Sequence, residues 1–267
     1  MSLREILDHR RAIRHYDPEK PLAPERVKEC IKMATLAPTS SNMQLWEAYH
    51  VTDKAVVANL AHACLDQLTA RSAQEMVVFV TRQDLYKQHA EAARKFEEGN
   101  QRRHAPKDKQ EKRIKKWDTY YGKVMPFLYS RFFGLWGLVR KLLAQLIGLS
   151  RPIVRQVSEG DVRVVVHKSC ALAAQTFMLA MSEAGYDTCP LEVFDSWSFA
   201  LTDKLLCGNC RIVGWLPPHC WMATATLLCG DRHTVVRRPS HCSLTCRTGS
   251  IIRMILRIGC MKSHDGN

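Results

Sequence analysis

Apolar and polar positions alternate along the chain with two periods, and each period predicts a kind of secondary structure. A repeat of three to four residues predicts helices, whereas alternation or a short apolar run predicts strands. The predicted helices are residues 2–9, 25–36, 54–68, 168–184 and 196–206. The predicted strands are residues 46–51 and 76–81, and a further strand starts at residue 210. A chain of 267 residues can bury a large core, and one domain with an insertion is the simplest organisation.

Charge and cysteine content indicate which partners and which cellular compartment suit this protein. The formal net charge is +13, which suits nucleic acid, an anionic membrane surface or an anionic cofactor as a partner. There are 11 cysteines, an odd number, and seven of them follow residue 206. The first residues form an amphipathic helix without the apolar run of a signal peptide. We therefore expect a cytoplasmic protein with free thiols.

The first segment with candidate chemistry is a basic run that directly follows the first predicted helix. Residues 10–16 read Arg-Arg-Ala-Ile-Arg-His-Tyr and lack a helical period. If this segment is extended, Arg10, Ala12 and Arg14 lie on one side of it. Two guanidinium groups with a small residue between them form a fork that suits a phosphate. A solvated basic turn is the alternative that the spacing leaves open.

The second segment is a loop dense in hydroxyl and amide groups, after the helix that Pro38 ends. Thr39-Ser40-Ser41-Asn42 offers short polar side chains and free backbone amides, and Gln44 follows two residues later. Such a loop can bind the edge of a polar ring. An ordinary Ser/Thr turn is the alternative.

Together, residues 10–16 and 37–46, separated by one helix, resemble the nitroreductase family of flavoenzymes. The family pattern is a basic turn, a helix, and then Ala-Pro-Ser-x-x-Asn-x-Gln-Pro-Trp. Ala12 stands where a Ser is usual and Leu45 where a Pro is usual. The resemblance implies an α+β fold: a mixed, mainly antiparallel sheet surrounded by helices, in an intertwined homodimer. It also implies an FMN-dependent oxidoreductase that passes hydride from NADH or NADPH through flavin N5 to a nitroaromatic, a quinone or a similar acceptor by a ping-pong mechanism.

The resemblance extends to a third segment and assigns the site residues. Tyr186–Asp195 is similar to the family's Thr-Cys-Pro turn, which passes its backbone along the flavin, but Val193 replaces a Gly. No side chain is expected to be catalytic, because flavin N5 is the reactive centre, and no metal is expected. The predicted cofactor-binding residues are Arg10, Arg11, Ala12, Arg14, Pro38, Thr39, Ser40, Asn42, Gln44, Pro190, Leu191 and Glu192.

By the same comparison, residues 84–160 are an insertion in a single FMN-binding domain of residues 1–213. The first half, to about Lys123, is highly charged and predicts an exposed helix or an arm. The second half, 124–149, is rich in Phe, Leu and Trp but is interrupted by cations, which disfavours a transmembrane span. We favour a pair of amphipathic helices that form a lid over the flavin. A weak contact with a membrane surface is the alternative.

Residues 214–267 form an atypical tail in which the family pattern dissolves. From Cys207 to the end there are eight Arg or Lys residues and two acidic residues, with no clear helix or strand period. A zinc site on Cys207, Cys210, Cys242 and Cys246 is disfavoured because the second pair has unusual spacing. A nucleic-acid-binding extension is disfavoured by poor aromatic interleaving, so no nucleic acid is expected. Translation in a shifted frame is the favoured explanation. Val193 and this tail also support a rival class, a flavin-dead family member acting as a basic interaction module.

Overall fold

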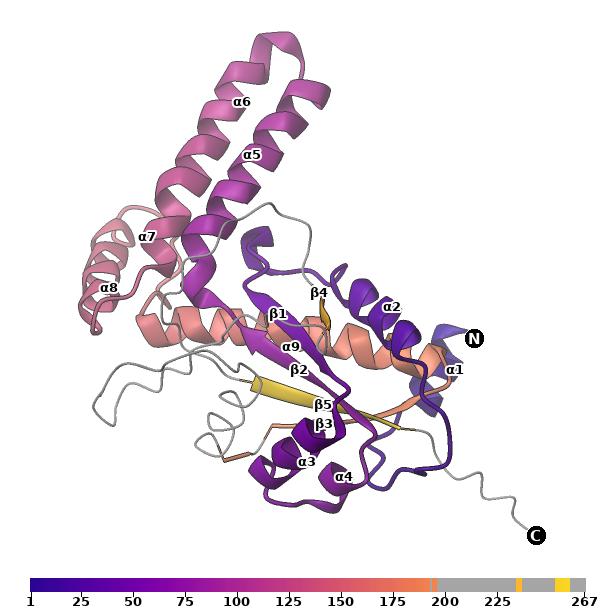
Figure 1. The fold of residues 1–267 in the computed structure, drawn as a ribbon. Coiled ribbons are helices and arrows are strands. Elements are labelled where there is room, and N and C mark those ends of the chain that lie inside the picture. Colours follow the sequence, from indigo (N-terminus) through magenta and orange to yellow (C-terminus); the bar gives the residue numbers. More distant parts are fainter. Residues whose placement is uncertain (193, 196–233, 237–252, 260–267) are drawn as a thin grey trace. The chain divides into compact units, whose positions relative to one another are not determined.

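The computed structural model describes residues 1–192, 194–195, 234–236 and 253–259 of the chain (Figure 1). It forms two compact units. Unit 1 comprises Met1–Ala37, Glu47–Thr81 and the described residues from Ala171 onward. Unit 2 comprises Pro38–Trp46 and Arg82–Cys170. Val193 and the helix predicted at 196–206 lie outside the described residues, as do all four cysteines of the zinc hypothesis.

Unit 1 is built on a five-stranded sheet in the order β3-β5-β2-β1-β4. The pairs β1–β4, β2–β5 and β3–β5 are antiparallel. All side chains of β2 are buried, as its continuous apolar run predicts. The strands are β1 (Trp46–Val51), β2 (Glu75–Thr81), β3 (Asp187–Leu191), β4 (Thr234–Val236) and β5 (Arg253–Gly259).

The helices of unit 1 begin at residues whose side chains or geometry stabilise a helix start. Ser2 and Glu5 form a reciprocal capping box on α1, and Asp53 caps α3 through the N–H groups of Ala55 and Val56. Phe177 of α9 packs on Phe79 of β2 with ring centroids 5.6 Å apart. The helices are α1 (Leu3–His9), α2 (Pro24–Ala34), α3 (Lys54–Ala63), α4 (Leu68–Arg71) and the C-terminal part of α9 (Glu159–Glu183).

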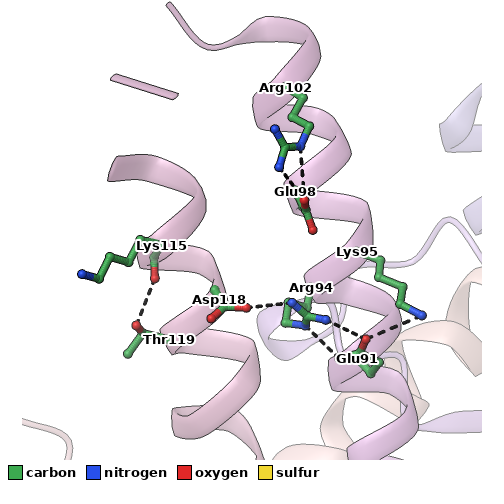
Figure 2. Close-up of polar contacts among 8 residues, drawn as sticks. All are labelled: Glu91, Arg94, Lys95, Glu98, Arg102, Lys115, Asp118 and Thr119. Carbon is green, nitrogen blue, oxygen red and sulfur yellow. Dashed lines mark hydrogen bonds and ion pairs between the residues drawn. The ribbon is translucent and has the colours of Figure 1, made fainter. Parts of the chain in front are cut away.

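Unit 2 is helical. Its helices α5 and α6 lie side by side as an antiparallel hairpin (Figure 1). Figure 2 shows how Arg94 of α5 joins them: its guanidinium donates to Glu91 one turn away and, over 2.7 Å, to Asp118 of α6. The elements are η1 (Ser40–Asn42), η2 (Gln83–Leu85), α5 (Tyr86–His104), α6 (Lys107–Thr119), the π-helical turn η3 (Tyr120–Val124), α7 (Met125–Tyr129), α8 (Leu135–Ile147) and the first part of α9.

Four sequence-based expectations about these elements were wrong in detail. The helix predicted over 54–68 ends at Ala63, because Leu65 and Asp66 adopt left-handed φ values of 59° and 49°. The helix predicted from Lys168 begins at Glu159, where Ser158 and Asp161 exchange hydrogen bonds like a capping box. The segment expected as a turn at 186–195 contains strand β3, and the tail contributes β4 and β5 to the sheet.

In the described part of the chain, α9 is long and apolar enough to cross a membrane by length and composition alone. Half of its most apolar window is buried inside the protein. The core helix of a soluble protein has the same properties, so this helix is weak evidence for a span.

Candidate functional site

The basic segment of unit 1 runs beside strand β3. Ala12 forms a parallel bridge with Thr188, and the N–H of Ile13 donates to Arg11 O over 3.1 Å, which makes a tight turn at Ala12. Ile13 packs against the core of unit 1, and Tyr16 ends the segment with a fully buried ring. The structure therefore brings two of the three predicted cofactor-binding segments together within this unit.

The three arginines of this segment differ in what they contact. Arg11 donates from Nη1 to the carbonyls of Leu7 and Arg10, so its guanidinium covers the end of α1. Among the described residues, the guanidinium groups of Arg10 and Arg14 have no hydrogen-bond or ion-pair partner. Arg14 is exposed and Arg10 is partly exposed. Both can therefore receive an anion without breaking an existing contact.

Strand β3 presents a polar atom beside the basic segment. The side chain of Thr188 is buried, and its Oγ1 has no hydrogen-bond partner within the described residues. Pro190 is partly exposed, Leu191 is buried and Glu192 is exposed at the end of the strand. A buried hydroxyl without a partner is costly, and such groups are commonly kept for a ligand or a water molecule.

The polar loop of unit 2 has a strained backbone. Ser41, Asn42 and Gln44 all have φ near +50°, a left-handed conformation that side chains other than Asn and Asp rarely adopt. Thr39 Oγ1 accepts the N–H of Gln44, and Asn42 Oδ1 accepts Gln44 Nε2 at 2.5 Å. Backbone strain of this kind costs free energy and concentrates at functional sites. Pro38 and Ser40 are exposed on the same loop.

Aromatic side chains of the insertion hold this loop in place. Tyr121 donates from its hydroxyl to Ser41 O over 3.0 Å, and the hydroxyl of Tyr120 lies 2.8 Å from Ser41 Oγ. Burial raises the pKa of Tyr121 and of Tyr129, and a side-chain hydrogen bond with Ser40 acts in the opposite direction on Tyr129. The phenols therefore stay protonated near neutral pH and can keep donating to the loop.

Two further contacts fix the loop from other elements of unit 2. Ser40 donates its N–H to Ser169 Oγ over 3.2 Å, and His89 Nδ1 donates to Met43 O over 2.8 Å. Leu45 is buried in the core of unit 2, and its carbonyl accepts the N–H of Arg82. An apolar Leu at this position thus contributes to packing where the family usually has Pro.

A groove of about 1030 Å³ with a mainly apolar surface adjoins the loop within unit 2. It runs along α6 and the π-helical turn, and Ser41 is part of its lining. The aromatic rings in it stack on one another, since Trp117 and Tyr121 lie 5.7 Å apart between centroids. Its cations are Lys109, Lys112, Arg113, Lys115 and Lys116. In the part of the chain that the structure describes, no cluster of His, Cys, Asp and Glu could hold a metal ion.

The sequence patterns did not single out several residues that the structure brings to these segments. Thr188 lay inside a recognised motif but was not assigned a role. Tyr120, Tyr121 and Ser169 come from the insertion and from α9, and no local pattern relates them to a loop some 80 or more residues earlier. The only clue in the sequence was the residue type, because a buried Tyr or Ser needs a hydrogen-bond partner.

The pattern of the Nitroreductase family matches residues 7–217, so this chain belongs to the nitroreductase family. Similar solved structures include a protein from Bacillus subtilis assigned as a nitroreductase, with a TM-score of 0.56 and 17% identity over 99% of this chain and 90% of that one. A nitroreductase family protein from Streptococcus pneumoniae has a TM-score of 0.54 and 16% identity over 100% and 94%. A protein from Exiguobacterium sibiricum assigned as a nitroreductase, solved in complex with FMN, has a TM-score of 0.53 and 18% identity over 97% and 88%.

Among proteins with curated descriptions, none matches the chain. At these identities the structural likeness shows the fold, and it confirms the α+β class that the two motifs implied. Membership of the family supports an oxidoreductase.

Proposed function

We propose that this protein is an FMN-dependent oxidoreductase that uses NADH or NADPH to reduce a nitroaromatic, a quinone or a similar acceptor. Bound FMN would supply the redox chemistry, namely hydride transfer through N5 between the nicotinamide and the acceptor in a ping-pong sequence. The residues of this chain bind and orient the reactants, and no side chain is assigned as a catalytic acid, base or nucleophile.

The observation that carries the proposal is the pair of unpartnered guanidinium groups, Arg10 and Arg14, on a segment bridged to β3. Two cations without a partner on one short segment suit a phosphate group, which takes up charge-assisted hydrogen bonds from arginine. We assign the phosphate and ribityl chain to Arg10, Arg11, Ala12 and Arg14. We assign contacts with the flavin ring to the backbone of Pro190, Leu191 and Glu192.

The strained loop supports the second half of the assignment. Asn42 Nδ2 and Gln44 Oε1 have no partner among the described residues, which leaves one donor and one acceptor on adjacent amides. The polar edge of an isoalloxazine ring also alternates donors and acceptors, so paired amides suit it. We therefore assign Pro38, Thr39, Ser40, Asn42 and Gln44 to the ring, some of them from a partner subunit of a homodimer.

The groove beside Ser41 supports a dinucleotide as the electron donor. It combines aromatic rings with five Lys or Arg side chains, which suits both the flat rings and the pyrophosphate of NADH or NADPH. These side chains are compatible with NADH and with NADPH. We place the working protein in the cytoplasm as a soluble homodimer.

Absorbance tests the proposal directly. The purified protein, or the protein reconstituted with FMN, is expected to show flavin absorbance that bleaches on addition of NADH or NADPH under anaerobic conditions and returns on addition of a quinone. A preparation that cannot be reconstituted with FMN would refute the proposal and favour a flavin-free interaction module.

A pair of matched variants localises the site. Arg14→Ala is expected to weaken FMN binding, because it removes a guanidinium that has no other partner. Arg4→Ala is the control, since Arg4 is 90% exposed on α1 and pairs only with Asp8. Equal FMN affinity in the two variants would remove Arg14 from the site.

A further inference from the structure

Helix α8 is oriented with its apolar side outward. Leu135, Leu138, Leu142 and Leu146 fall on one stripe of the helix, and each is more than half exposed. We call these four residues the leucine face. The opposite side of the helix is buried and carries Gly137, Arg140 and Ala144. A surface helix normally places its leucines inside and its arginine outside, so this arrangement calls for a partner that covers the leucines.

Two residues on the buried side fix this orientation. Arg140 is 3% exposed, and its guanidinium donates to the carbonyls of Val157, Phe127 and Ser130. At Gly137 a Cβ atom would lie 2.9 Å from the backbone nitrogen of Glu159, so only glycine permits this approach. Rotating α8 to bury its leucines in unit 2 would break three hydrogen bonds and this close contact.

The segment that contains the leucine face is predominantly cationic, and the acidic groups near it belong to the start of α9, where Glu159 accepts the N–H of Phe132. Between Asp118 and Glu159 the sequence contains six Lys or Arg residues and no Asp or Glu. Lys123 and Lys141 are exposed on this segment. Phe132, Phe133 and Trp136 extend the exposed apolar surface at the start of α8. Helices that lie in the interface of an anionic bilayer typically carry leucines flanked by aromatic residues and cations.

We infer that the leucine face docks this protein onto the surface of an anionic lipid bilayer. The leucines enter the boundary of the acyl chains while the lysines contact the headgroups. A second copy of the same face is disfavoured because it would bring two predominantly cationic segments together, with Lys141 exposed on each. The inference concerns the insertion alone and does not rest on the proposed flavin chemistry.

Vesicle sedimentation of the full chain tests the inference. Binding is expected to vesicles of phosphatidylcholine mixed with phosphatidylglycerol, weaker binding to phosphatidylcholine alone, and weaker binding again at high salt. The triple variant Leu138→Ser, Leu142→Ser, Leu146→Ser is expected to bind at least about tenfold more weakly, because each serine removes apolar area that enters the bilayer.

A matched triple variant in unit 1 is the control. Leu36→Ser, Leu65→Ser and Leu68→Ser replace leucines that are 80%, 59% and 60% exposed, and wild-type vesicle binding is expected. Circular dichroism before and after sedimentation checks that both variants are folded. As a measurement that needs no serine variant, the emission of Trp136 is expected to shift to shorter wavelength on binding, with Trp136→Phe as the reference.

Four outcomes would overturn the inference. One is no binding to either vesicle, and another is equal binding by the leucine-face variant and the wild type. A third is loss of a dimer in the variant, measured by light scattering, without any vesicle binding, which would make the face a contact between copies. The fourth is a changed kcat/KM for the acceptor without any vesicle binding, which would make α8 a lid.

Discussion

Replacing the buried Arg140 by methionine tests the reason for the inverted orientation of α8. Arg140 donates from Nε to Val157 O over 2.8 Å and from Nη1 to Ser130 O and Phe127 O over 2.9 and 3.1 Å. Methionine keeps most of the side-chain length but supplies no donor. All three carbonyls would lose the arginine as donor, and within the described residues only Phe127 O would keep another side-chain donor, the hydroxyl of Ser130.

The expected magnitude follows from these contacts. A hydrogen bond from a charged donor contributes about 1.5–3 kcal/mol. The sum for three such bonds is an upper limit on the destabilisation of α8, and the net destabilisation is smaller. Releasing the guanidinium from burial offsets part of that loss, and burial already lowers the pKa of Arg140. One of its nitrogens, Nη2, has no partner within the described residues, which adds to the offset. We expect a net destabilisation of α8 of about 3 kcal/mol.

Native-state hydrogen exchange measured by mass spectrometry is the assay, because it reports opening of α8 separately from global unfolding. Arg140→Met is expected to speed exchange in peptides covering Leu135–Ile147 by a factor of about 100. Lys141→Met is the control, since it removes the same charge from an exposed neighbour and is expected to change exchange less than about threefold. Equal exchange in the two variants would show that the three carbonyl contacts do not hold the helix.

Three further predictions concern other parts of the chain. Arg14→Ala is expected to raise the Kd for FMN by about ten- to a hundredfold relative to Arg4→Ala, measured by fluorescence titration. Burial, with a smaller contribution from Arg163, lowers the pKa of His167 from 6.5 to about 4, so the folded state resists protonation. The contribution of neutral His167 to the free energy of unfolding is therefore present above pH 6.5 and is lost as the pH falls from there toward 4. Urea unfolding is expected to show a free energy of unfolding about 1–2 kcal/mol lower at about pH 5 than at about pH 7, and His167→Gln is expected to lack this difference. Burial also raises the pKa of Cys170 to about 12, and this thiol should be alkylated only after unfolding, as followed by mass spectrometry.

Elements governed by short-range signals were predictable from the sequence. Strand β1 has the predicted bounds, Trp46–Val51, because its alternation and the Asp53 cap that follows are both local. Helix α1, predicted over residues 2–9, spans Leu3–His9 and is capped by the neighbouring Ser2. The two family motifs were also contiguous stretches, so the family could be identified from them and is confirmed.

Features that depend on distant residues were not predictable. The arm of the insertion is a hairpin in which Arg94 meets Asp118, and neither residue alone indicates that pairing. The neighbour of β3 is β5, whose sequence has no clear period and pairs through its backbone. The assignment of the twelve cofactor-binding residues stays a prediction. The structure adds one observation to it, the backbone bridge between Ala12 and Thr188, which brings two of the predicted segments together.

The π-helical turn at Tyr120–Val124 sits inside an otherwise continuous run of helix from Lys107 to Tyr129. A π-turn holds one residue more than an α-helical turn, so it accommodates an extra residue while the helix beyond it keeps its phase. Removing Gly122 would let this turn close as α-helix with Met125 and Tyr129 still on the core side. Successive side chains are rotated by less in a π-turn than in an α-helix, which helps the adjacent Tyr120 and Tyr121 both reach Ser41. A single-codon deletion here would therefore be felt first in the contacts that hold the strained loop.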